Sequence, residues 1–310
     1  MPSLLHIGTR ASPLALWQAE ATRALIARLV PGMDAADALP IVTLSTQGDR
    51  VRDRPLADLG GKGLFTKDID RATLDGRVDL AVHSLKDVPS DLPDGLVLAG
   101  VLPRADPRDV WISGTGTAIA DLPPGSAVGT CSPRRQAQLL IARPDLSVVP
   151  MRGNVGTRLQ RLRDGAIAGT FLAKAGLDRL GVEVPGAVVL APGEMLPAVG
   201  QGAIALICRT EDAAARAAAA AISCADTADR VSAERAMLAR LGGSCHTPIA
   251  GLAELAGDRL SLRGLVALPD GSRSVARSVE GSRSDAADLG DALGRRLRDE
   301  AGDLLAAMGV

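Results

Sequence analysis

The amino-acid sequence predicts an α/β protein of two lobes followed by a small α+β domain. Three observations support this: strand-like apolar runs alternate with helix-like patterns over residues 4–222, the alternation starts afresh near residue 123, and three short runs joined by tight turns follow residue 248. Alternating strands and helices form a mostly parallel sheet covered on both faces. Short turns between neighbouring runs form an antiparallel meander.

The composition is that of an ordinary globular protein. Its 310 residues, 46% of them hydrophobic, suffice for two or three domains. Lys plus Arg (35) balance Asp plus Glu (36), and only 1% of residues are aromatic, so we expect no binding to nucleic acid or membranes. Four cysteines without a CxxC pair and three scattered histidines predict neither a metal site nor disulfides. The N-terminus lacks a signal-peptide pattern and no apolar run has membrane-spanning length, which predicts a cytoplasmic protein.

The first lobe begins with a strand over residues 4–9 and a helix over residues 14–30. Ser12 and Pro13 are a good N-cap and first residue for this helix. Because the connecting loop lies at the carboxyl end of the strand, Arg10 and Ser12 are placed where open α/β sheets bind ligands, beside a helix N-terminus that favours anions. A solvated surface charge is an equally good interpretation of Arg10 alone.

Further strands are predicted over residues 41–46, 79–84 and 96–102. The polar, glycine-rich loop over residues 47–63 is suited to close over a site, but its GGKG core lacks the residues of a nucleotide-binding P-loop. Lys86 and Asp87 directly follow the strand ending at residue 84, again at the functional edge of the sheet. The alternative is a surface pair that closes a turn.

The second lobe is predicted to contain strands over residues 127–130, 147–151, 167–172 and 187–190 and helices over residues 133–143, 155–163 and 175–180. Residues 127–163 include seven arginines and a single acid, Asp145. The planar guanidinium suits carboxylates and phosphates, so this segment predicts a polyanion site.

Not all these arginines have the same expected role. Arg134, Arg135 and Arg152 follow strand ends or precede a turn, and we expect them to point into one cleft. The alternative, a solvated basic helix face, is favoured for Arg143, Arg161 and Arg163.

The chain then continues through a hinge-like loop at residues 197–202, a strand over residues 203–209 and helices over residues 212–222 and 226–241. Runs over residues 249–255, 260–268 and 274–279 form the meander. Ser284 is predicted to cap one final amphipathic helix with leucines at helical spacing.

The stretch LGGSCHTPIA, residues 241–250, contains the strongest chemical signal. Gly242 and Gly243 suit the left-handed turn that ends a helix, and Pro248 prevents its continuation. Cys245 is therefore expected on a short connection, where a substrate can reach a thiol. A small buried hydrophobic residue is the competing interpretation.

Ten motifs in order give a more specific indication. The chain resembles the hydroxymethylbilane synthase family, also called porphobilinogen deaminases, from end to end. The motifs are IGTRASPLALWQA (7–19), GGKGLFTK (60–67), AVHSLKDVP (81–89), DPRD (106–109), RRQAQL (134–139), RGNVGTRL (152–159), LAKAGLDRLG (172–181), PAVGQGA (197–203), AERAM (233–237) and GGSCHTPI (242–249).

The resemblance implies a fold and a domain division. Two doubly wound, mixed-sheet lobes similar to two-lobed periplasmic binding proteins precede a small α+β domain with a three-stranded antiparallel sheet. Domain 1 comprises residues 1–102 and 203–222, domain 2 residues 103–202, and domain 3 residues 223–310.

The resemblance also implies that four porphobilinogen molecules are condensed head to tail on a dipyrromethane cofactor, which is attached to Cys245 as a thioether. A soft thiol adds readily to the electrophilic methylene left when the pyrrole loses ammonia. Asp87 is implied as the catalytic residue, able to stabilise a cationic pyrrole and move its proton. No metal is implied, and we expect a monomer.

Ligand residues follow from the same motifs. The implied cofactor ligands are Ser12, Lys86, Thr130, Ser132, Arg134, Arg135, Asn154 and Arg158. The implied substrate contacts are Arg10, Ser12, Arg152, Arg158, Arg179 and Gln201, and the implied lid residues are Lys62 and Phe65.

The chain departs from the common family pattern at Cys131, Pro133, Ala105, Ala168 and Ile207. None of these changes removes Cys245, Asp87 or the central arginines, so activity is expected.

Two other classes of protein fit parts of the sequence. A two-lobed solute-binding protein needs neither Cys245 nor a third domain, and a thiol hydrolase would pair Cys245 with His246 or His83. Only the synthase should carry a covalent dipyrrole, which intact mass detects.

Overall fold

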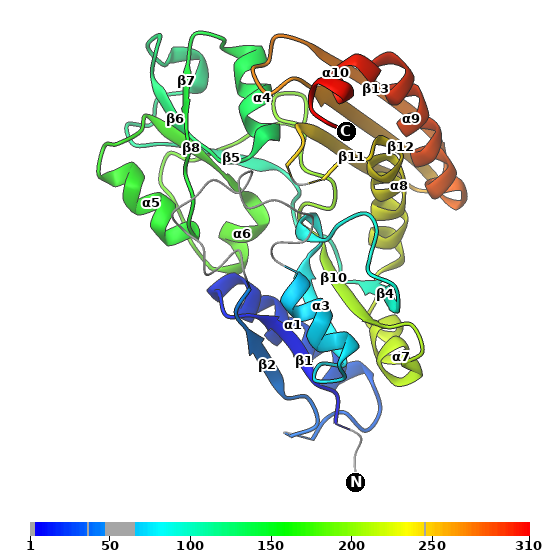
Figure 1. Ribbon diagram of the computed structural model, residues 1–310. Helices are drawn as coiled ribbons and strands as arrows, with labels where there is room; N and C mark the ends of the chain where they lie inside the picture. Colours follow the sequence, from blue (N-terminus) through cyan, green and yellow to red (C-terminus); the bar gives the residue numbers. More distant parts are fainter. Residues whose placement is uncertain (1–3, 36, 47–65, 245) are drawn as a thin grey trace. The chain divides into compact units, whose positions relative to one another are not determined.

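The computed structural model describes residues 4–35, 37–46, 66–244 and 246–310. The chain forms two compact units (Figure 1). Among the described residues, unit 1 consists of 4–46, 66–105 and 202–228, and unit 2 of 106–201 and 229–310, in each case without the residues left undescribed. The chain thus leaves unit 1, returns to it and leaves it again.

Unit 1 is built on a five-stranded mixed sheet. Its order is β2 (Ile41–Leu44), β1 (Ile7–Arg10), β3 (Leu80–Ser84), β10 (Ile204–Arg209) and β4 (Leu96–Val101). Strand β1 runs parallel to β2 and β3, whereas β10 runs antiparallel to β3 and β4. The expected helix start is confirmed, because Ser12 caps α1 (Pro13–Leu29) with proline in the first turn.

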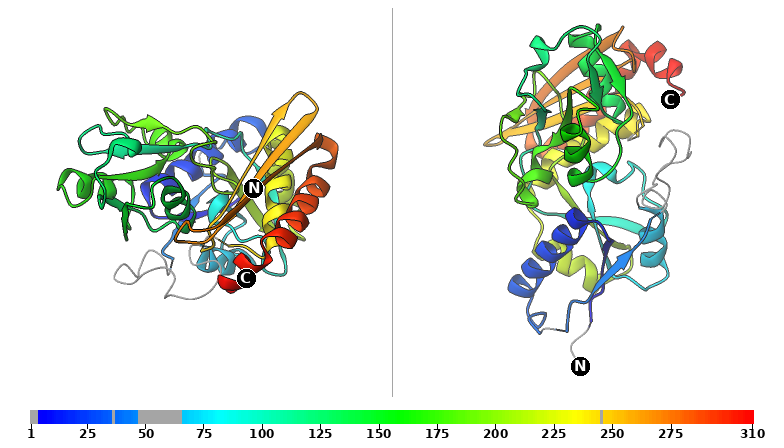
Figure 2. Two further views of the ribbon diagram at one scale, coloured as in Figure 1. Left: turned by 90° about the horizontal axis from the view of Figure 1, so that it is seen from above. Right: turned by 90° about the vertical axis from the view of Figure 1, so that its left-hand side faces the viewer.

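Helices cover both faces of this sheet. Buried residues of α1 and α7 (Ala213–Ala221), among them Ala19, Ile26 and Ala215, share one core with Ile7 and Leu206 of the strands. Helix α3 (Lys67–Leu74), whose Ile69 is fully buried, lies on the other face (Figure 2).

The first sheet of unit 2 repeats this arrangement. Its order is β7 (Ser147–Val149), β6 (Ala127–Gly129), β8 (Gly169–Ala173), β5 (Asp109–Ser113) and β9 (Val188–Val189). Strand β6 is parallel to β7 and β8, and β5 is antiparallel to β8 and β9. Val110 and Ile112 pack with α5 (Val155–Arg163) and α6 (Lys174–Arg179), while Trp111 packs with Leu139 of α4 (Pro133–Ala142) on the other face.

Both expectations are confirmed: each of these two sheets is mostly parallel, because all its strands but one run in the same direction, and each is mixed, as the resemblance implied. Each sheet contains one antiparallel strand, β10 or β5, that a distant segment supplies. The alternation of strands and helices does not predict β5, because this strand precedes residue 123, near which the alternation of the second lobe begins. Periodicity reveals a strand but carries no information on its direction or neighbours.

The C-terminal part is the predicted antiparallel meander of β11 (Ile249–Ala256), β12 (Arg259–Ala267) and β13 (Ser274–Ser282). Helices α8 (Ala225–Leu241) and α9 (Ala286–Glu300) share one apolar core with these strands. The prediction of one final helix capped by Ser284 was wrong. Asp285 is the N-cap of α9, Ser284 lies in a preceding 3-10 turn capped by Ser282, and a separate α10 (Gly302–Ala307) follows Ala301.

Helices α8 and α9 approach each other closely through two glycines. A Cβ at Gly290 would lie 2.1 Å from the carbonyl oxygen of Ala233, and one at Gly294 would lie 2.6 Å from Cβ of Arg240. Only a residue without a side chain allows these backbones to pack at this distance.

Candidate functional site

The first group of predicted site residues comes together at the carboxyl ends of β1 and β3. Arg10 ends β1, and the Ser12 hydroxyl accepts a hydrogen bond from the Ala15 amide at 3.3 Å. After β3 the chain makes a 3-10 turn, Leu85–Asp87. Because β1 and β3 are adjacent and parallel, Arg10, Ser12, Lys86 and Asp87 all line one pocket of about 90 Å³.

Two further side chains in this pocket were not assigned from the sequence. Gln18 of α1 donates a hydrogen bond from Nε2 to the Ser84 hydroxyl at 2.8 Å. His83 is buried, and none of the described residues makes a hydrogen bond to its Nε2. Burial, and then the positive charge of Arg10, lowers the pKa of His83 to about 4, so this imidazole is neutral near pH 7.

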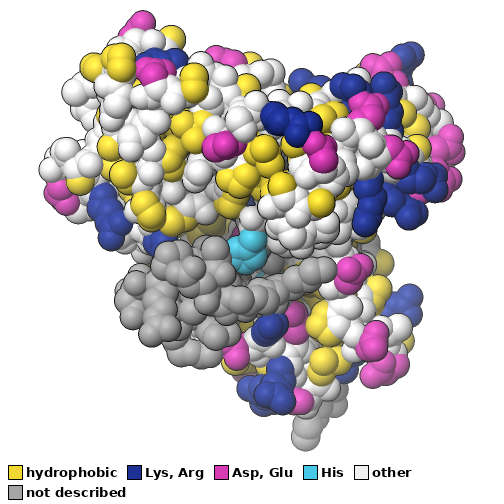
Figure 3. Space-filling model, turned by 45° about the horizontal axis from the view of Figure 1, so that its top comes forward, with side chains coloured by type: hydrophobic (Ala, Val, Ile, Leu, Met, Phe, Trp, Pro, Cys, Tyr) yellow, Lys and Arg dark blue, Asp and Glu magenta, His cyan; other side chains and the backbone are white. Residues whose placement is uncertain are grey.

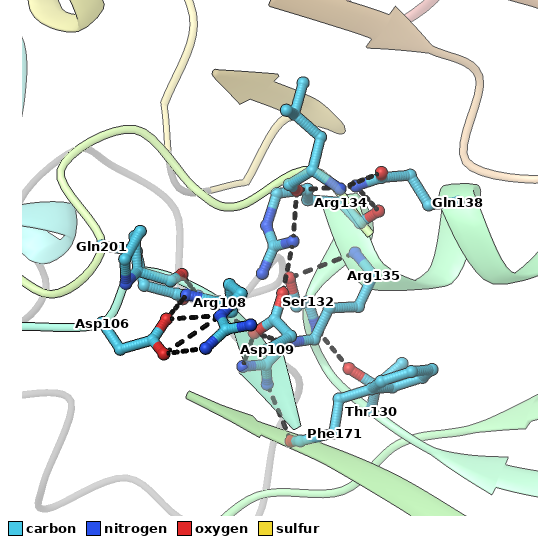
Figure 4. A network of polar contacts seen from close by, with 12 residues as sticks. Asp106, Arg108, Asp109, Thr130, Ser132, Arg134, Arg135, Gln138, Phe171 and Gln201 are labelled. Atoms are coloured by element: carbon cyan, nitrogen blue, oxygen red, sulfur yellow. Dashed lines mark hydrogen bonds and ion pairs between the residues drawn. The ribbon is translucent and has the colours of Figure 1, made fainter. Parts of the chain in front are cut away.

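A second group, which we call the arginine cluster, consists of Arg134, Arg135 and Asp109 (Figure 4). Both arginines come from the first turn of α4, and Asp109 begins β5. Arg135 donates to Asp109 Oδ1 from Nη2 at 2.7 Å and from Nε at 3.2 Å. Arg134 Nη1 lies 2.7 Å from Asp109 Oδ2 and also donates to the carbonyl of Leu196 at 2.7 Å.

The arginine cluster carries a net positive charge inside the protein. Its three side chains are at most 7% exposed, and two guanidinium groups face one carboxylate. Burial alone would raise the pKa of Asp109, but the charges of Arg134 and Arg135 hold it well below its usual value. Burial lowers the pKa of Arg134, and no described residue hydrogen-bonds to its Nε. The cluster is therefore suited to a further anionic partner.

Two glutamines hold the arginine cluster in place. The amide of Gln201, a side chain that is 1% exposed, donates to Asp109 Oδ1 at 3.0 Å and to the Pro107 carbonyl at 2.7 Å. Gln138 of α4 accepts from the Leu196 amide at 2.7 Å and donates to the Leu196 carbonyl at 3.0 Å. Gln201, predicted as a substrate contact, thus uses its amide within the protein.

The remaining predicted ligands gather at two helix starts. Ser132 caps α4, and its own amide donates to the Thr130 hydroxyl at 3.1 Å. Asn154 caps α5 by accepting from the Thr157 amide at 2.9 Å, and Arg158 donates from Nε to the Gly153 carbonyl at 2.9 Å. Helix N-termini attract anions, so both starts are suited to carboxylates.

The structure revises the predicted division of the arginines. Arg134 and Arg135 were expected to point into one cleft with Arg152, but they are buried against Asp109. Arg161 is exposed, as expected for a solvated helix face. Arg143 instead pairs with Asp145 and donates to three backbone carbonyls, those of Ile119, Ala120 and Leu122.

Arg179 is another predicted substrate contact, at the end of α6. Burial lowers its pKa to about 10, against the opposing effect of Asp178. The guanidinium still remains charged at neutral pH.

Cys245, Lys62 and Phe65 lie outside the described residues. The connection around Cys245 begins with Gly242 at a φ of 69° and turns through Thr247, whose hydroxyl accepts from the Ser244 amide at 3.0 Å. His246 is half-buried, and burial lowers its pKa. Cys131, Cys208 and Cys224 are free thiols, and burial raises the pKa of Cys208 to about 11, which makes it a poor nucleophile.

Two negative findings concern the described residues alone. They contain no group of three or more side chains arranged to bind a metal ion. Among them, no helix is long and apolar enough to cross a membrane.

Comparisons with known proteins cover nearly the whole chain. Residues 5–217 match the family model of the porphobilinogen deaminase dipyrromethane cofactor binding domain, and residues 228–299 match that of the porphobilinogen deaminase C-terminal domain. The porphobilinogen deaminase of Paracoccus denitrificans is 52% identical over 297 residues, which cover 96% of this chain and 94% of the relative. That of Nitrobacter hamburgensis is 50% identical over 300 residues, 97% of this chain and 94% of the relative.

Solved structures include a periplasmic binding protein from Brucella ovis with glutathione bound. It is 15% identical, with a TM-score of 0.43, and the match covers 76% of this chain and 68% of that protein.

Proposed function

Because the chain belongs to the porphobilinogen deaminase family, we propose that it is a hydroxymethylbilane synthase, a transferase of tetrapyrrole biosynthesis. It joins four porphobilinogen molecules head to tail, with loss of ammonia, and releases hydroxymethylbilane. The observation that carries this proposal is the 52% identity over 96% of the chain. The two groups of site residues supply the chemistry that the reaction needs.

The arginine cluster fits the dipyrromethane cofactor. Each pyrrole of this cofactor carries an acetate and a propionate, and the cluster offers a buried excess of positive charge and an Arg134 Nε without a described partner. Arg134, Arg135 and the capped starts of α4 and α5, with Thr130, Ser132, Asn154 and Arg158, would hold these carboxylates. When attached to Cys245, the cofactor supplies the nucleophilic pyrrole to which the first substrate is added.

The unit 1 pocket fits the incoming substrate. Arg10 and Ser12 bind carboxylates of porphobilinogen, and the proposed cofactor ligand Lys86 and the proposed catalytic Asp87 line the same pocket. Porphobilinogen becomes an electrophilic methylene pyrrole cation when ammonia leaves, and a carboxylate near its ring stabilises that charge. Asp87 then accepts the proton that the ring loses after the new carbon–carbon bond forms. His83 remains neutral at pH 7 and adds no charge to the pocket.

Several finer assignments remain predictions. We propose three domains with the boundaries expected from the sequence, a monomer in the cytoplasm, a lid containing Lys62 and Phe65, and substrate contacts from Arg152 and Arg179. For Gln201 we propose a supporting role, because its amide donates to Asp109 and Pro107.

Intact mass spectrometry tests the proposal. The purified protein should be heavier than its sequence by one dipyrromethane, and porphobilinogen should be consumed with release of ammonia. We predict that Cys245→Ala folds normally but carries no adduct and has no activity, because truncating one thiol on a short connection removes the anchor at little cost in stability. A solute-binding protein or a thiol hydrolase would show no adduct, and an adduct on Cys245→Ala would place the attachment elsewhere, with Cys131 as the first candidate.

A further inference from the structure

Glu234, in the middle of α8, is a fully buried carboxylate outside the predicted site. Its exposed fraction is 0%, although Ala233 and Met237 of the same helix belong to an apolar core. Oε2 accepts a hydrogen bond from the Gly200 amide at 2.7 Å, and Oε1 accepts one from the Ala253 amide at 2.8 Å. Burying a carboxylate is costly unless such bonds compensate for lost hydration, and an apolar residue would pack here without that cost.

The two amides belong to segments far apart in the sequence. Gly200 lies in the loop of residues 197–201, at a φ of 72° that favours glycine, and Ala253 lies in β11. The same loop is joined to β11 a second time, because the Gly251 amide donates to the Pro197 carbonyl at 3.0 Å. Glu234 therefore fixes this loop against α8 and β11.

The residue after Gly200 connects this anchor to the arginine cluster. Gln201 donates to Asp109 Oδ1 at 3.0 Å, and Asp109 in turn pairs with Arg134 and Arg135. A continuous series of contacts thus joins Glu234 to both guanidinium groups. Helix α8 ends at Leu241, four residues before Cys245.

We propose that Glu234 is a positioning residue: it holds the 197–201 loop so that Gln201 supports Asp109, and thereby sets the arginine cluster relative to the helix that leads to Cys245. This inference rests on the proposed function. Glu234 itself contacts no substrate. Its influence on binding passes through Gln201, which makes the two residues energetically coupled.

The test is a double-mutant cycle on the full-length protein with its cofactor, using Glu234→Gln, Gln201→Leu and the double variant. Glu234→Gln keeps the shape of the side chain, but it replaces one acceptor oxygen with an NH₂ group. That group then faces a backbone N–H, so one of the two hydrogen bonds is lost. Porphobilinogen is added to the cofactor that the arginine cluster is proposed to hold, so its productive binding depends on where the cofactor lies. We therefore expect Glu234→Gln to raise KM for porphobilinogen about 10- to 100-fold with little change in kcat, since Asp87 is untouched. Gln201→Leu should raise KM similarly. In the double variant the second change should add less than about twofold, because both break the same series of contacts.

Thr227→Val is the matched control. Thr227 is also buried on α8 and accepts one backbone hydrogen bond, from the Arg104 amide at 2.9 Å, but it is not part of the series. It should lower the melting temperature and leave KM unchanged. Intact mass gives a readout independent of turnover: with limiting porphobilinogen, Glu234→Gln should show a smaller fraction of protein with added pyrrole units than Thr227→Val.

The outcomes separate the inference from the function. If the wild-type protein lacks the adduct and releases no ammonia, both the proposed function and the inference about Glu234 are wrong. If the wild-type protein is active and Glu234→Gln loses stability with an unchanged KM, or if the two KM effects multiply, Glu234 is only structural. Should Glu234→Gln not fold, Gln201→Leu alone still decides, because a wild-type KM in that variant contradicts the proposal.

Discussion

Three acidic side chains of this protein differ in what their surroundings allow them to do. Asp87 lines a pocket with Arg10 and Lys86, where it can meet a substrate. Asp109 is buried between two arginines, which keep it ionised. Glu234 is buried and accepts hydrogen bonds from two backbone amides. Under the proposed function, a carboxylate therefore serves the reaction at Asp87, charge balance at Asp109 and positioning at Glu234.

For Asp87 we predict that Asp87→Asn gives a folded protein that still carries the dipyrromethane cofactor but turns over about 10²- to 10⁴-fold more slowly. The amide preserves the shape, yet it can neither balance a cationic pyrrole nor accept its proton. Ammonia release, measured alongside intact mass, checks both parts. Turnover at the wild-type rate would show that Asp87 only closes the turn after β3.

The buried His83 predicts a pH dependence of stability. Its folded-state pKa of about 4 lies below the value of 6.5 of an unperturbed histidine, so unfolding takes up a proton between these values. The contribution of neutral His83 is fully present above pH 6.5 and is lost as the pH falls toward 4, by about 3 kcal/mol in total. His83→Gln should flatten this part of the profile in urea unfolding at pH 7, 6, 5 and 4.5. An unchanged profile would contradict this assignment.

At the scale of elements, the helix starts matter most for the site. Ser12 and Ser132 each cap a helix whose first turn follows a strand of a mixed sheet, and in both cases proline occupies the first turn. The Ser-Pro pattern predicted the start of α1 and also marks the start of α4, where the predicted helix begins at residue 133 as observed. It positions Arg10 before α1, and Arg134 and Arg135 within α4, by the same local geometry.

The packing of α8 against α9 gives a prediction at this scale. Gly290→Ala should destabilise the protein by about 1–3 kcal/mol or more, because the added Cβ would lie 2.1 Å from the Ala233 carbonyl oxygen and force the helices apart. Gly302→Ala is the control, since nothing lies within 4 Å of a Cβ built there. Urea unfolding of both variants measures the difference. Equal stability of the two would mean that α9 shifts without cost.

For the whole molecule, the sequence predicted the elements better than their partners. The helix expected over residues 155–163 is α5 (Val155–Arg163), because capping and periodicity are local signals. The antiparallel strands β5 and β10, the pairing of Asp109 with both arginines and the burial of Gln201 all depend on segments distant in sequence. In the sequence, Asp109 appears only as the last residue of the DPRD motif. Its pairing with Arg134 and Arg135 could not be predicted, because it depends on β5 lying beside α4 in the fold.

The placement of β10 between β3 and β4 also has a consequence for synthesis on the ribosome. Strand β4 has no place in the first sheet until β10 separates it from β3, and Asp106–Gln201 is translated in between. We therefore expect the nascent N-terminal lobe to remain incomplete until β10 has been translated, when residues 106–201 are already available to fold. Domains usually fold in the order of their translation, and this topology predicts the reverse order for the two lobes.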